Sequence, residues 1–512
     1  MMLGMPPTTT TTDDDGNESA PTTTTSFPSP LDIASAALDH YEHELPQKGK
    51  PRDKDEWTVC AAIVASFHHG NHGNNNNNKE QLTVIASATG TKCTAVDAHS
   101  SETVLHDSHA EVLARRGLLR VLWHEIVLWN SKDGGGGEGK GENNDNDESK
   151  PPNCTLRLLE KLSNDQQYRL RPNVHLHLYV SDAPCGDASI YPLKNDSAIG
   201  QPSSSTTTTT TTAAAAAATS STTLQFTGAK IIVSPATQVP LQAVDTLLDQ
   251  HCAREQVQLL GRLRSKSARS NLQAHQRSRS LSCSDKLVRW SVLGCQGTAL
   301  LQYLVEPIYL TSIVTSRDAR AKGDTAQLQA LQRALVDRVK AVQAVWQHCA
   351  KEEEGNIIGR VPTVHVVDRR FVRGKAAAEQ QQQLQQQQQQ PDHTNSTTTT
   401  VRKRKHDEMK LKTSSPTGVA INWNAYDRTV ELTVGARGTR QGKKSTALAS
   451  RLSRHGLWQI MQPMISSGDS SYAACKESVT RQHRLREIIF RKGPLAGWLL
   501  NDTDQAQSSQ ES

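Results

Sequence analysis

The sequence lacks a long apolar run, because no stretch of its 512 residues approaches the ~20 that a membrane-spanning helix needs. Its first 30 residues are rich in Thr and Asp and lack the basic start and apolar centre of a signal peptide. We therefore expect no membrane association and an intracellular location, in the nucleus, the cytoplasm or both. The basic run RKRK at 402–405 is typical of a nuclear import signal.

Hydrophobic residues are also scarce, at 35%, and the mean hydropathy is −0.58. The deficit is local, because polar and repetitive stretches dilute an otherwise ordinary globular sequence. We expect these stretches to be insertions near 67–79, 131–150, 195–223 and 375–415. They interrupt a single domain at 31–504, which lies between disordered tails at 1–30 and 505–512.

The order of apolar patterns predicts one central sheet. Period-2 or β-rich runs indicate strands, and three- to four-residue spacing indicates helices. The expected elements are a helix at 31–45, a hairpin at 57–66 and 81–88, a helix at 108–129, a strand at 174–181, a helix from 282 through 303, a strand at 307–315 and a helix at 325–349. This order favours a three-layer α/β/α sandwich, with an extended C-terminal α+β portion from 418 onward.

Two short motifs place metal-binding side chains beside a carboxylate. The first is DSHAE at 107–111, and the second is DAPCGD at 182–187. Imidazole and thiolate groups bind Zn²⁺, and a catalytic zinc site keeps one position open for a water whose pKa falls to about 7. We therefore predict His109 and Cys185 as ligands, each at the start of a helix, and Glu111 as the proton acceptor. Position 188 holds Ala188, so a Pro-Cys-x-x-Cys pair is missing.

A third ligand is expected among the other cysteines. The chain has nine, an odd number without regular spacing, which favours free thiols and metal ligands over disulfides. Cys283 stands among small and polar residues at a predicted helix start, as Cys185 does, whereas Cys295 follows a glycine in an apolar helix and suits packing. The remaining candidates have less suitable surroundings: Cys60, Cys93, Cys154, Cys252, Cys349 and Cys475. We predict a zinc site of His109, Cys185 and Cys283.

The motifs HAE at 109–111, PCGD at 184–187 and SCSDK at 282–286 together resemble the zinc-site motifs of the RNA adenosine deaminases. That family comprises the double-stranded RNA editing enzymes and the eukaryotic tRNA deaminase that makes inosine next to the alanine anticodon. GTKC at 90–93, RWSVLG at 289–294 and LVEPIY at 304–309 match as well, and the similarity runs from about 31 to 504. The resemblance implies a cytidine-deaminase-like sandwich, a zinc ion and hydrolytic conversion of adenosine to inosine.

Within that family, the tRNA enzyme is the better match. We expect no double-stranded RNA-binding module, and the basic segment 261–279, which contains no acid, resembles the Gly-Arg-rich loop of the tRNA enzymes. The predicted partner is the anticodon stem-loop of alanine tRNA, deaminated at the adenosine 3′ of the anticodon (position 37), with no obligate protein partner. The predicted RNA contacts are Thr91, Lys92, Arg264, Lys266 and Arg269.

The resemblance also implies a buried inositol hexakisphosphate. Several basic residues lie in otherwise apolar helices, where unpaired charges would cost several kcal/mol each. The expected ligands are Arg115, Arg116, Lys286, Arg289, Trp290, Arg454, Tyr472, Lys476, Arg486, Trp498 and Asp504. Asp107 and Lys286 are expected to link this polyanion to the zinc site. Gln482 departs from the pattern, since the editing enzymes have a tyrosine there.

Three alternative functions use parts of the same pattern. The chain could deaminate adenosine in other structured RNA or mRNA. It could deaminate cytosine, which the displaced third cysteine and the extended C-terminal portion disfavour. It could instead be an inactive RNA-binding protein with a structural zinc, and Glu111 argues against this because such a site has no use for the carboxylate.

Overall fold

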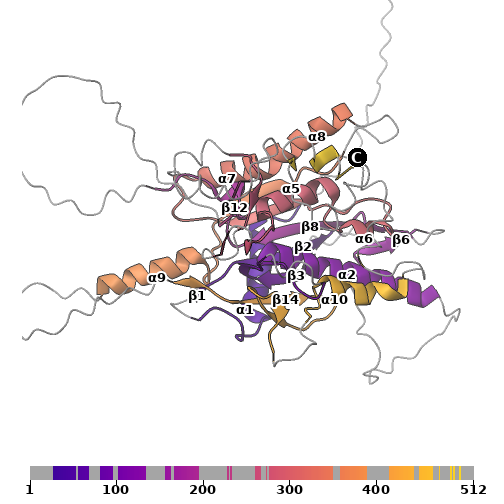
Figure 1. The fold of residues 1–512 in the computed structure, drawn as a ribbon, viewed down its shortest axis with the longest axis horizontal. Coiled ribbons are helices and arrows are strands. Elements are labelled where there is room, and N and C mark those ends of the chain that lie inside the picture. The colour runs from indigo at the N-terminus through magenta and orange to yellow at the C-terminus, as the bar shows by residue number, and fades with distance from the viewer. Residues whose placement is uncertain are drawn as a thin grey trace, which may run out of the picture.

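In a computed structural model of the chain, helices surround one mixed eight-stranded sheet (Figure 1). The structure describes residues 27–52, 56–68, 81–95, 102–133, 156–162, 167–194, 228–229, 231–232, 260–266, 272–273, 276–349, 358–388, 414–442, 449–464, 472, 485–486, 488–490 and 495–496. Most positions of the expected tails and insertions lie outside these ranges. A mixed α/β fold with one central sheet agrees with the sequence pattern.

The central sheet has the strand order β12-β11-β8-β2-β3-β14-β15-β16. Its strands are β12 (Thr363–Val367), β11 (Ser312–Ser316), β8 (Val174–Val180), β2 (Cys60–Phe67), β3 (Gln81–Thr89), β14 (Val419–Asn424), β15 (Glu431–Val434) and β16 (Thr439–Arg440). Strands β12, β11 and β8 run parallel, and the other neighbours are antiparallel. The predicted hairpin of β2 and β3 and the predicted strand β8 are confirmed. Strand β11 begins five residues later than the pattern suggested.

Short strands pair outside this sheet. They are β1 (Glu56–Trp57) with β13 (Ser415–Pro416), β4 (Thr91–Cys93) with β5 (Asp107–His109), β6 (Leu159–Lys161) with β7 (Tyr168–Leu170), and β9 (Ile231–Ile232) with β10 (Arg264–Ser265). The pair β4–β5 matters for function because β5 leads directly into a long helix.

The helices cover both faces of the sheet. They are α1 (Pro30–His43), α2 (Ala110–Asp133), α5 (Cys283–Leu293), α6 (Thr298–Leu301), α7 (Ala326–Leu331), α8 (Arg338–Cys349), α9 (Lys375–Gln388) and α10 (Arg454–Met461). Side chains alternate along β2, so Ile63 packs in the cluster that contains Leu118 of α2, whereas Val64 packs with Ile33 of α1. No helix in the described ranges is both long and apolar enough to cross a bilayer.

The first helix follows directly from its sequence. Ser29 caps α1 by accepting a hydrogen bond from the Asp32 backbone N–H at 3.1 Å, and a proline occupies the first helical position. The predicted helix at 31–45 is therefore confirmed. The predicted helix at 325–349 is present as α7, a π-helical turn at Gln332–Asp337, and α8.

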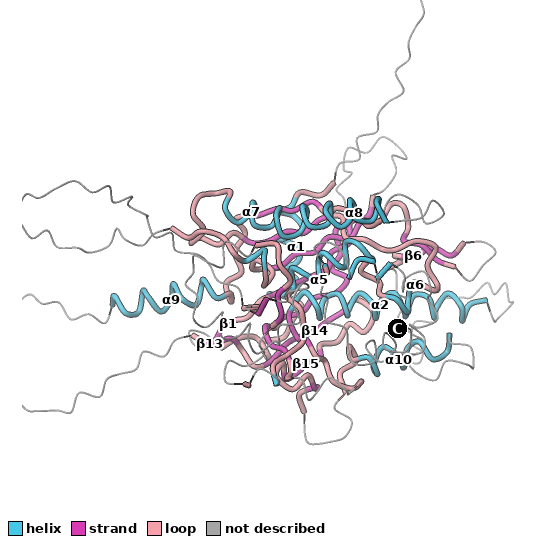
Figure 2. The backbone as a smooth tube through the Cα atoms, turned by 45° about the horizontal axis from the view of Figure 1, so that its top comes forward, coloured by secondary structure: helices cyan, strands magenta, loops and turns pink. Residues whose placement is uncertain are grey.

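Two expectations about helices are wrong. The apolar helix expected from 282 through 303 ends at Leu293, because Gly294 has φ +85° and a side chain there would meet Gln296. Pro184 opens no α-helix, and only the 3-10 turn Asp187–Ser189 follows it. The stretch expected as an insertion from 375 begins with helix α9, which extends away from the sheet in both views (Figures 1 and 2).

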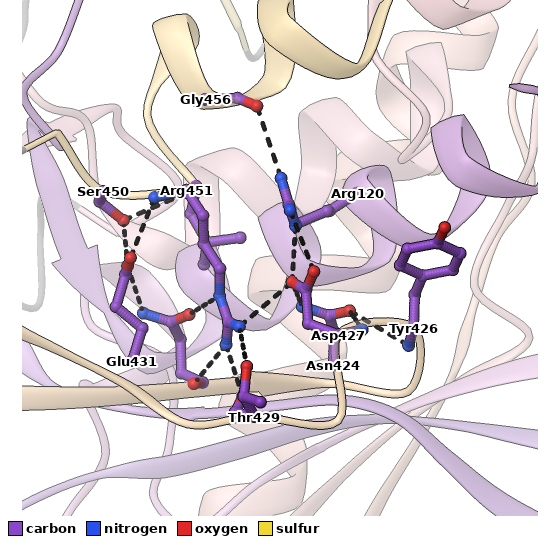
Figure 3. Close-up of polar contacts among 11 residues, drawn as sticks. Arg120, Asn424, Tyr426, Asp427, Thr429, Glu431, Ser450, Arg451 and Gly456 are labelled. Carbon is purple, nitrogen blue, oxygen red and sulfur yellow. Dashed lines mark hydrogen bonds and ion pairs between the residues drawn. The ribbon is translucent and has the colours of Figure 1, made fainter. Parts of the chain in front are cut away.

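A polar network fixes the C-terminal portion to α2 (Figure 3). Arg120 of α2 pairs with both carboxylate oxygens of Asp427, at 2.6 and 3.0 Å, and Arg451 reaches the same carboxylate at 3.1 Å. Glu431 of β15 accepts the backbone N–H of Arg451 at 3.1 Å. The network holds the segment before α10 against β14 and β15, and α10 lies beside α2 in both ribbon views (Figures 1 and 2).

Glu125 of α2 also has a buried carboxylate. It accepts backbone N–H groups from Leu158, at 3.0 and 3.1 Å, and from Leu159 at 2.9 Å, so it fixes the start of β6. Burial raises the pKa of this carboxyl from 4.5 to about 7.

This shift predicts a pH dependence of stability. Because the folded-state pKa lies above the unfolded one, the contribution is fully present below pH 4.5 and is lost as pH rises to about 7. A shift of this size corresponds to roughly 3 kcal/mol. Glu125→Gln should flatten the fall in unfolding free energy across this window, as urea denaturation at a series of pH values would show. An unchanged slope would contradict the assignment.

Candidate active site

The predicted ligand His109 lies at the junction of β5 and α2. Strand β5 pairs antiparallel with β4, which sets Thr91 opposite His109 and Lys92 opposite Ser108. Glu111 follows in the first turn of α2. The local order strand–helix therefore places an imidazole and a carboxylate at the N-terminal end of one helix.

Asp107 joins His109 to two lysines. One carboxylate oxygen of Asp107 forms a hydrogen bond of 2.7 Å with His109 Nδ1. The other oxygen accepts hydrogen bonds from Lys266 Nζ at 2.6 Å, from Ser280 Oγ at 2.7 Å and from Lys286 Nζ. A carboxylate on Nδ1 fixes the orientation of the ring and leaves Nε2 available to a metal. The contact between Asp107 and Lys286 agrees with the link expected from the sequence.

The two predicted cysteine ligands lie side by side. Cys283 is the first residue of α5, capped by Ser282, and its backbone N–H donates to Cys185 Sγ at 3.4 Å. A hydrogen bond with Cys283 holds the pKa of the Cys185 thiol well below its usual value, against the effect of burial, and Lys266 and His109 add to it. Lys266 Nζ also lies 3.3 Å from Cys283 Sγ. These surroundings favour a thiolate at Cys185, whereas burial and the neighbouring Cys185 raise the pKa of the Cys283 thiol well above its usual value.

Glu111, the predicted proton acceptor, is a buried carboxylate. Its side chain is 3% exposed, and burial, reinforced by Cys185, raises the pKa of its carboxyl. Its Oε2 has no hydrogen-bond partner among the described residues. A buried carboxylate with a raised pKa and an oxygen that has no partner in the described part of the chain can both take up and return a proton.

The donor set suits zinc. One imidazole and two thiolates are ligands that Zn²⁺ prefers, and this leaves the fourth position open. Burial and Lys266 oppose protonation of His109. Asp107 and Cys185 outweigh these effects and raise the pKa of His109 to about 9, so the surroundings stabilise a positive charge at this position. Within the described ranges, no three His, Cys, Asp or Glu side chains are arranged as a ready metal cage. The fit therefore rests on the chemistry and the neighbourhood of these three residues.

Several of the residues predicted to bind inositol hexakisphosphate lie close together, on α2 and on the elements that pack against it. Arg115 lies over the Trp290 ring at 5.0 Å, and Arg289 lies over the Phe490 ring. Burial, together with Arg115 and Arg454, lowers the pKa of Arg116 to about 10, while Tyr472 opposes this.

Arg116 Nη2 is buried without a hydrogen-bond partner in the described part of the chain. Several guanidinium groups that repel one another, beside a buried N–H donor without a partner among the described residues, form a site that suits a polyanion.

The predicted RNA contacts divide into two kinds. Thr91 and Lys92 are partly exposed beside His109, where a bound nucleotide could reach them. Arg264 and Lys266 are buried, at 0% and 2% exposure, so the structure does not support a surface phosphate contact for either. Lys266 instead bridges Asp107 and Cys283. In the sequence it is one base in a basic run, and nothing in that run distinguishes it.

Four predicted residues lie outside the described ranges, and the predictions for them stay untested. Arg269, Lys476, Trp498 and Asp504 lie outside those ranges, and Arg486 belongs to a short described stretch at 485–486. The import signal expected at 402–405 also lies outside them.

Comparison with known proteins identifies the family of the chain. Residues 86–501 match the adenosine-deaminase (editase) domain family. Mouse tRNA-specific adenosine deaminase 1 is 27% identical over 93% of this chain and 99% of its own length. The Drosophila tRNA-specific enzyme is 30% identical over 61% of this chain and 59% of its own length, and the Drosophila double-stranded RNA-specific editase Adar is 27% identical over 51% and 30%. Since the domain match covers well over half of the sequence, this chain belongs to the adenosine-deaminase (editase) family.

Proposed function

We propose that this chain is a zinc-dependent enzyme that hydrolyses adenosine to inosine in tRNA. The observation that carries the proposal is the position of Glu111. Its buried carboxylate, with one oxygen unpaired among the described residues, lies in the electrostatic neighbourhood of His109 and Cys185. A structural zinc site would gain nothing from such a carboxylate. We further propose the three-layer cytidine-deaminase-like sandwich as its scaffold.

Each residue has a role in this reaction. His109, Cys185 and Cys283 would hold a zinc ion, which would lower the pKa of a water to about 7 and so supply a nucleophile at neutral pH. Glu111 removes a proton from the attacking water and delivers it to N1 of adenine as C6 is attacked. It then takes the remaining proton from the hydroxyl group on C6 and passes it to the exocyclic nitrogen, so that the C6–N bond breaks, ammonia leaves and the C6 carbonyl of inosine forms. Asp107 holds His109 in the required orientation throughout.

We propose tRNA as the substrate, and the adenosine 3′ of the anticodon (position 37) in alanine tRNA as its target. The mouse tRNA-specific relative aligns over nearly its whole length, whereas the Drosophila editase aligns over 30% of its own. The base of an anticodon loop can leave its stack at low cost, which a buried site requires. Thr91 and Lys92 lie where they could contact the flanking backbone.

The substrate assignment predicts a selective reaction. Purified protein incubated with total tRNA should produce A-to-I changes in alanine tRNA at the position 3′ of the anticodon, detected by sequencing. A perfect RNA duplex and free adenosine serve as competing substrates. Efficient editing of the duplex, or turnover of the nucleoside, would contradict the assignment.

We also propose that the residues grouped on and around α2 hold inositol hexakisphosphate. The phosphates would accept from Arg115, Arg116 and Arg454, and Arg289, Trp290 and Tyr472 would complete the wall, together with the expected ligands outside the described ranges. Lys286, through Asp107, would connect this anion to His109.

Bound polyanion has a direct test. Acid extraction of purified protein followed by mass spectrometry should release about one inositol hexakisphosphate per chain, because burying several guanidinium groups without a counter-charge would be too costly. Arg116→Gln should lower that yield and the thermal stability together. Active, zinc-loaded protein without any inositol phosphate would rule the proposal out.

A further inference from the structure

The turn at 185–187 and the first turn of α5 at 283–285, together called the cysteine loops below, share a feature that the proposed chemistry does not use. In each loop an aspartate follows two residues after the cysteine, in Cys185-Gly186-Asp187 and in Cys283-Ser284-Asp285. Both aspartates are 0% exposed. A carboxylate removed from water in this way needs a cationic or hydrogen-bonding partner.

Each aspartate is paired with a different arginine from one stretch of the chain. Arg333 Nε donates to Asp187 Oδ2 at 3.1 Å, and its Nη2 donates to the backbone carbonyls of Asp187 at 2.8 Å and Ile190 at 3.0 Å. Arg338 Nη2 donates to Asp285 Oδ1 at 2.6 Å and is itself buried. The two cysteine loops are therefore held by two ion pairs of the same kind.

The backbone between these arginines explains how both reach the loops. Arg333 lies in the π-helical turn Gln332–Asp337, and Arg338 begins α8 directly after it. In a regular α-helix two residues five positions apart point about 140° apart, because each residue turns the chain by about 100°. A π-helical turn closes its hydrogen bond between residues five apart, so these residues come round to nearly the same side. The turn thus presents both guanidinium groups to one place.

The two loops also contact each other closely. Ser284 Oγ donates to the carbonyls of Pro184 at 3.1 Å and Cys185 at 3.0 Å, and it accepts the Ala188 N–H at 3.1 Å. Gly186 has φ +107°, and a Cβ there would lie 2.2 Å from the Ser282 hydroxyl. A small shift of either loop would therefore change the distance between Cys185 and Cys283.

The same aspartates bind the segment that carries Lys266. Asp187 accepts the Gly261 N–H at 2.9 Å, and Asp285 accepts the Arg264 N–H at 2.9 Å. Lys266 follows two residues later and reaches Cys283 and Asp107. The two cysteine loops and the segment that carries Lys266 thus meet at two carboxylates, whose charges Arg333 and Arg338 balance.

We propose that Arg333 and Arg338 are positioning residues for the metal centre, which hold Cys185 and Cys283 at the spacing that a metal ion requires by fixing Asp187 and Asp285. This rests on the proposed zinc-dependent function. The hydrogen bonds of both arginines in the described part of the chain go to Asp187, Ile190 and Asp285 and not to a cysteine, so the effect passes through the loops. Residues that orient metal ligands in this way typically change metal affinity by about 10–100-fold when they are replaced.

The test compares zinc binding in single variants. Zinc affinity is measured by competition with a chromogenic chelator, and the visible spectrum is recorded after replacement of zinc by Co²⁺, which reports thiolate coordination. Arg333→Gln and Arg338→Gln should each weaken zinc binding by about 10–100-fold and alter the cobalt spectrum. Arg338→Lys should restore part of the affinity, because it keeps the charge beside Asp285. In an Asp285→Asn background, Arg338→Gln should have a smaller effect than alone.

Arg120→Gln is the matched control, since it also breaks an arginine–aspartate pair, with Asp427 (Figure 3). It should lower the melting temperature while leaving zinc affinity and the cobalt spectrum at wild-type values. Arg333 is partly exposed, so Arg333→Gln and Arg338→Lys remain informative if Arg338→Gln does not fold.

Two failures are distinguishable. Wild-type affinity and an unchanged cobalt spectrum in the folded Arg333 and Arg338 variants would overturn this inference alone. A wild-type protein that binds no zinc would overturn the proposed function, and this inference with it.

Discussion

Replacing Glu111 with Gln is expected to reduce the rate of inosine formation by at least about 10²–10⁴-fold while zinc remains bound. Gln keeps the size and the hydrogen-bonding capacity of the side chain but cannot take up the proton of the attacking water. Because Glu111 is not among the three proposed ligands, the metal content of the variant should equal that of the wild type. Single-turnover kinetics on alanine tRNA, with metal analysis of the same preparation, measure both quantities.

Glu125→Gln is the matched control for this prediction. Glu125 is a buried glutamate of the same helix whose pKa is also raised by burial, but it binds the backbone at Leu158 and Leu159. Its replacement should change stability and not the rate of the chemical step. Near-wild-type deamination by Glu111→Gln would mean that another group moves the proton.

Replacing Cys283 with Ala is expected to remove zinc and activity together. The proposed site has three protein ligands, and the loss of one of its two thiolates leaves one imidazole and one thiolate, too few for a stable tetrahedral zinc site. Zinc content should fall from about one per chain to near zero, and inosine formation should fall below detection. Elemental analysis after dialysis against a chelator measures the first quantity.

Cys295→Ala separates the loss of a ligand from the loss of a buried sulfur. Cys295 is 1% exposed, and burial raises the pKa of its thiol to about 11, as expected for a packing residue. This variant should lose stability yet keep its zinc. Retention of zinc by Cys283→Ala, or its loss in Cys295→Ala, would require a different ligand set.

The parts of the fold that the sequence predicted are those with local causes. Period-2 alternation indicated β8, β-rich runs indicated the β2–β3 hairpin, and Ser29 with Pro30 set the start of α1. The neighbourhood of Cys185 and Cys283 was also predictable, because each lies among small and polar residues next to the site motifs. Such signals depend on adjacent residues and survive any tertiary arrangement.

The errors have tertiary or conformational causes. The apolar pattern runs through Gly294, but the left-handed backbone there ends α5. Lys266 looks like one of several bases that could bind RNA, and only the folded chain brings it to Asp107, 159 residues away in sequence. The pairing of Arg333 and Arg338 with the cysteine loops depends on a π-helical turn, which no simple apolar pattern indicates.

Inosine formation as a function of zinc content shows whether deamination depends on the proposed metal site. Protein stripped of metal by a chelator is reloaded with increasing amounts of zinc, and inosine in alanine tRNA is quantified by mass spectrometry of the digested nucleosides. The account predicts no inosine from the stripped protein and a yield that rises in proportion to zinc until about one ion per chain is bound. Undiminished inosine formation by zinc-free protein, or none at full zinc occupancy with intact tRNA, would contradict it.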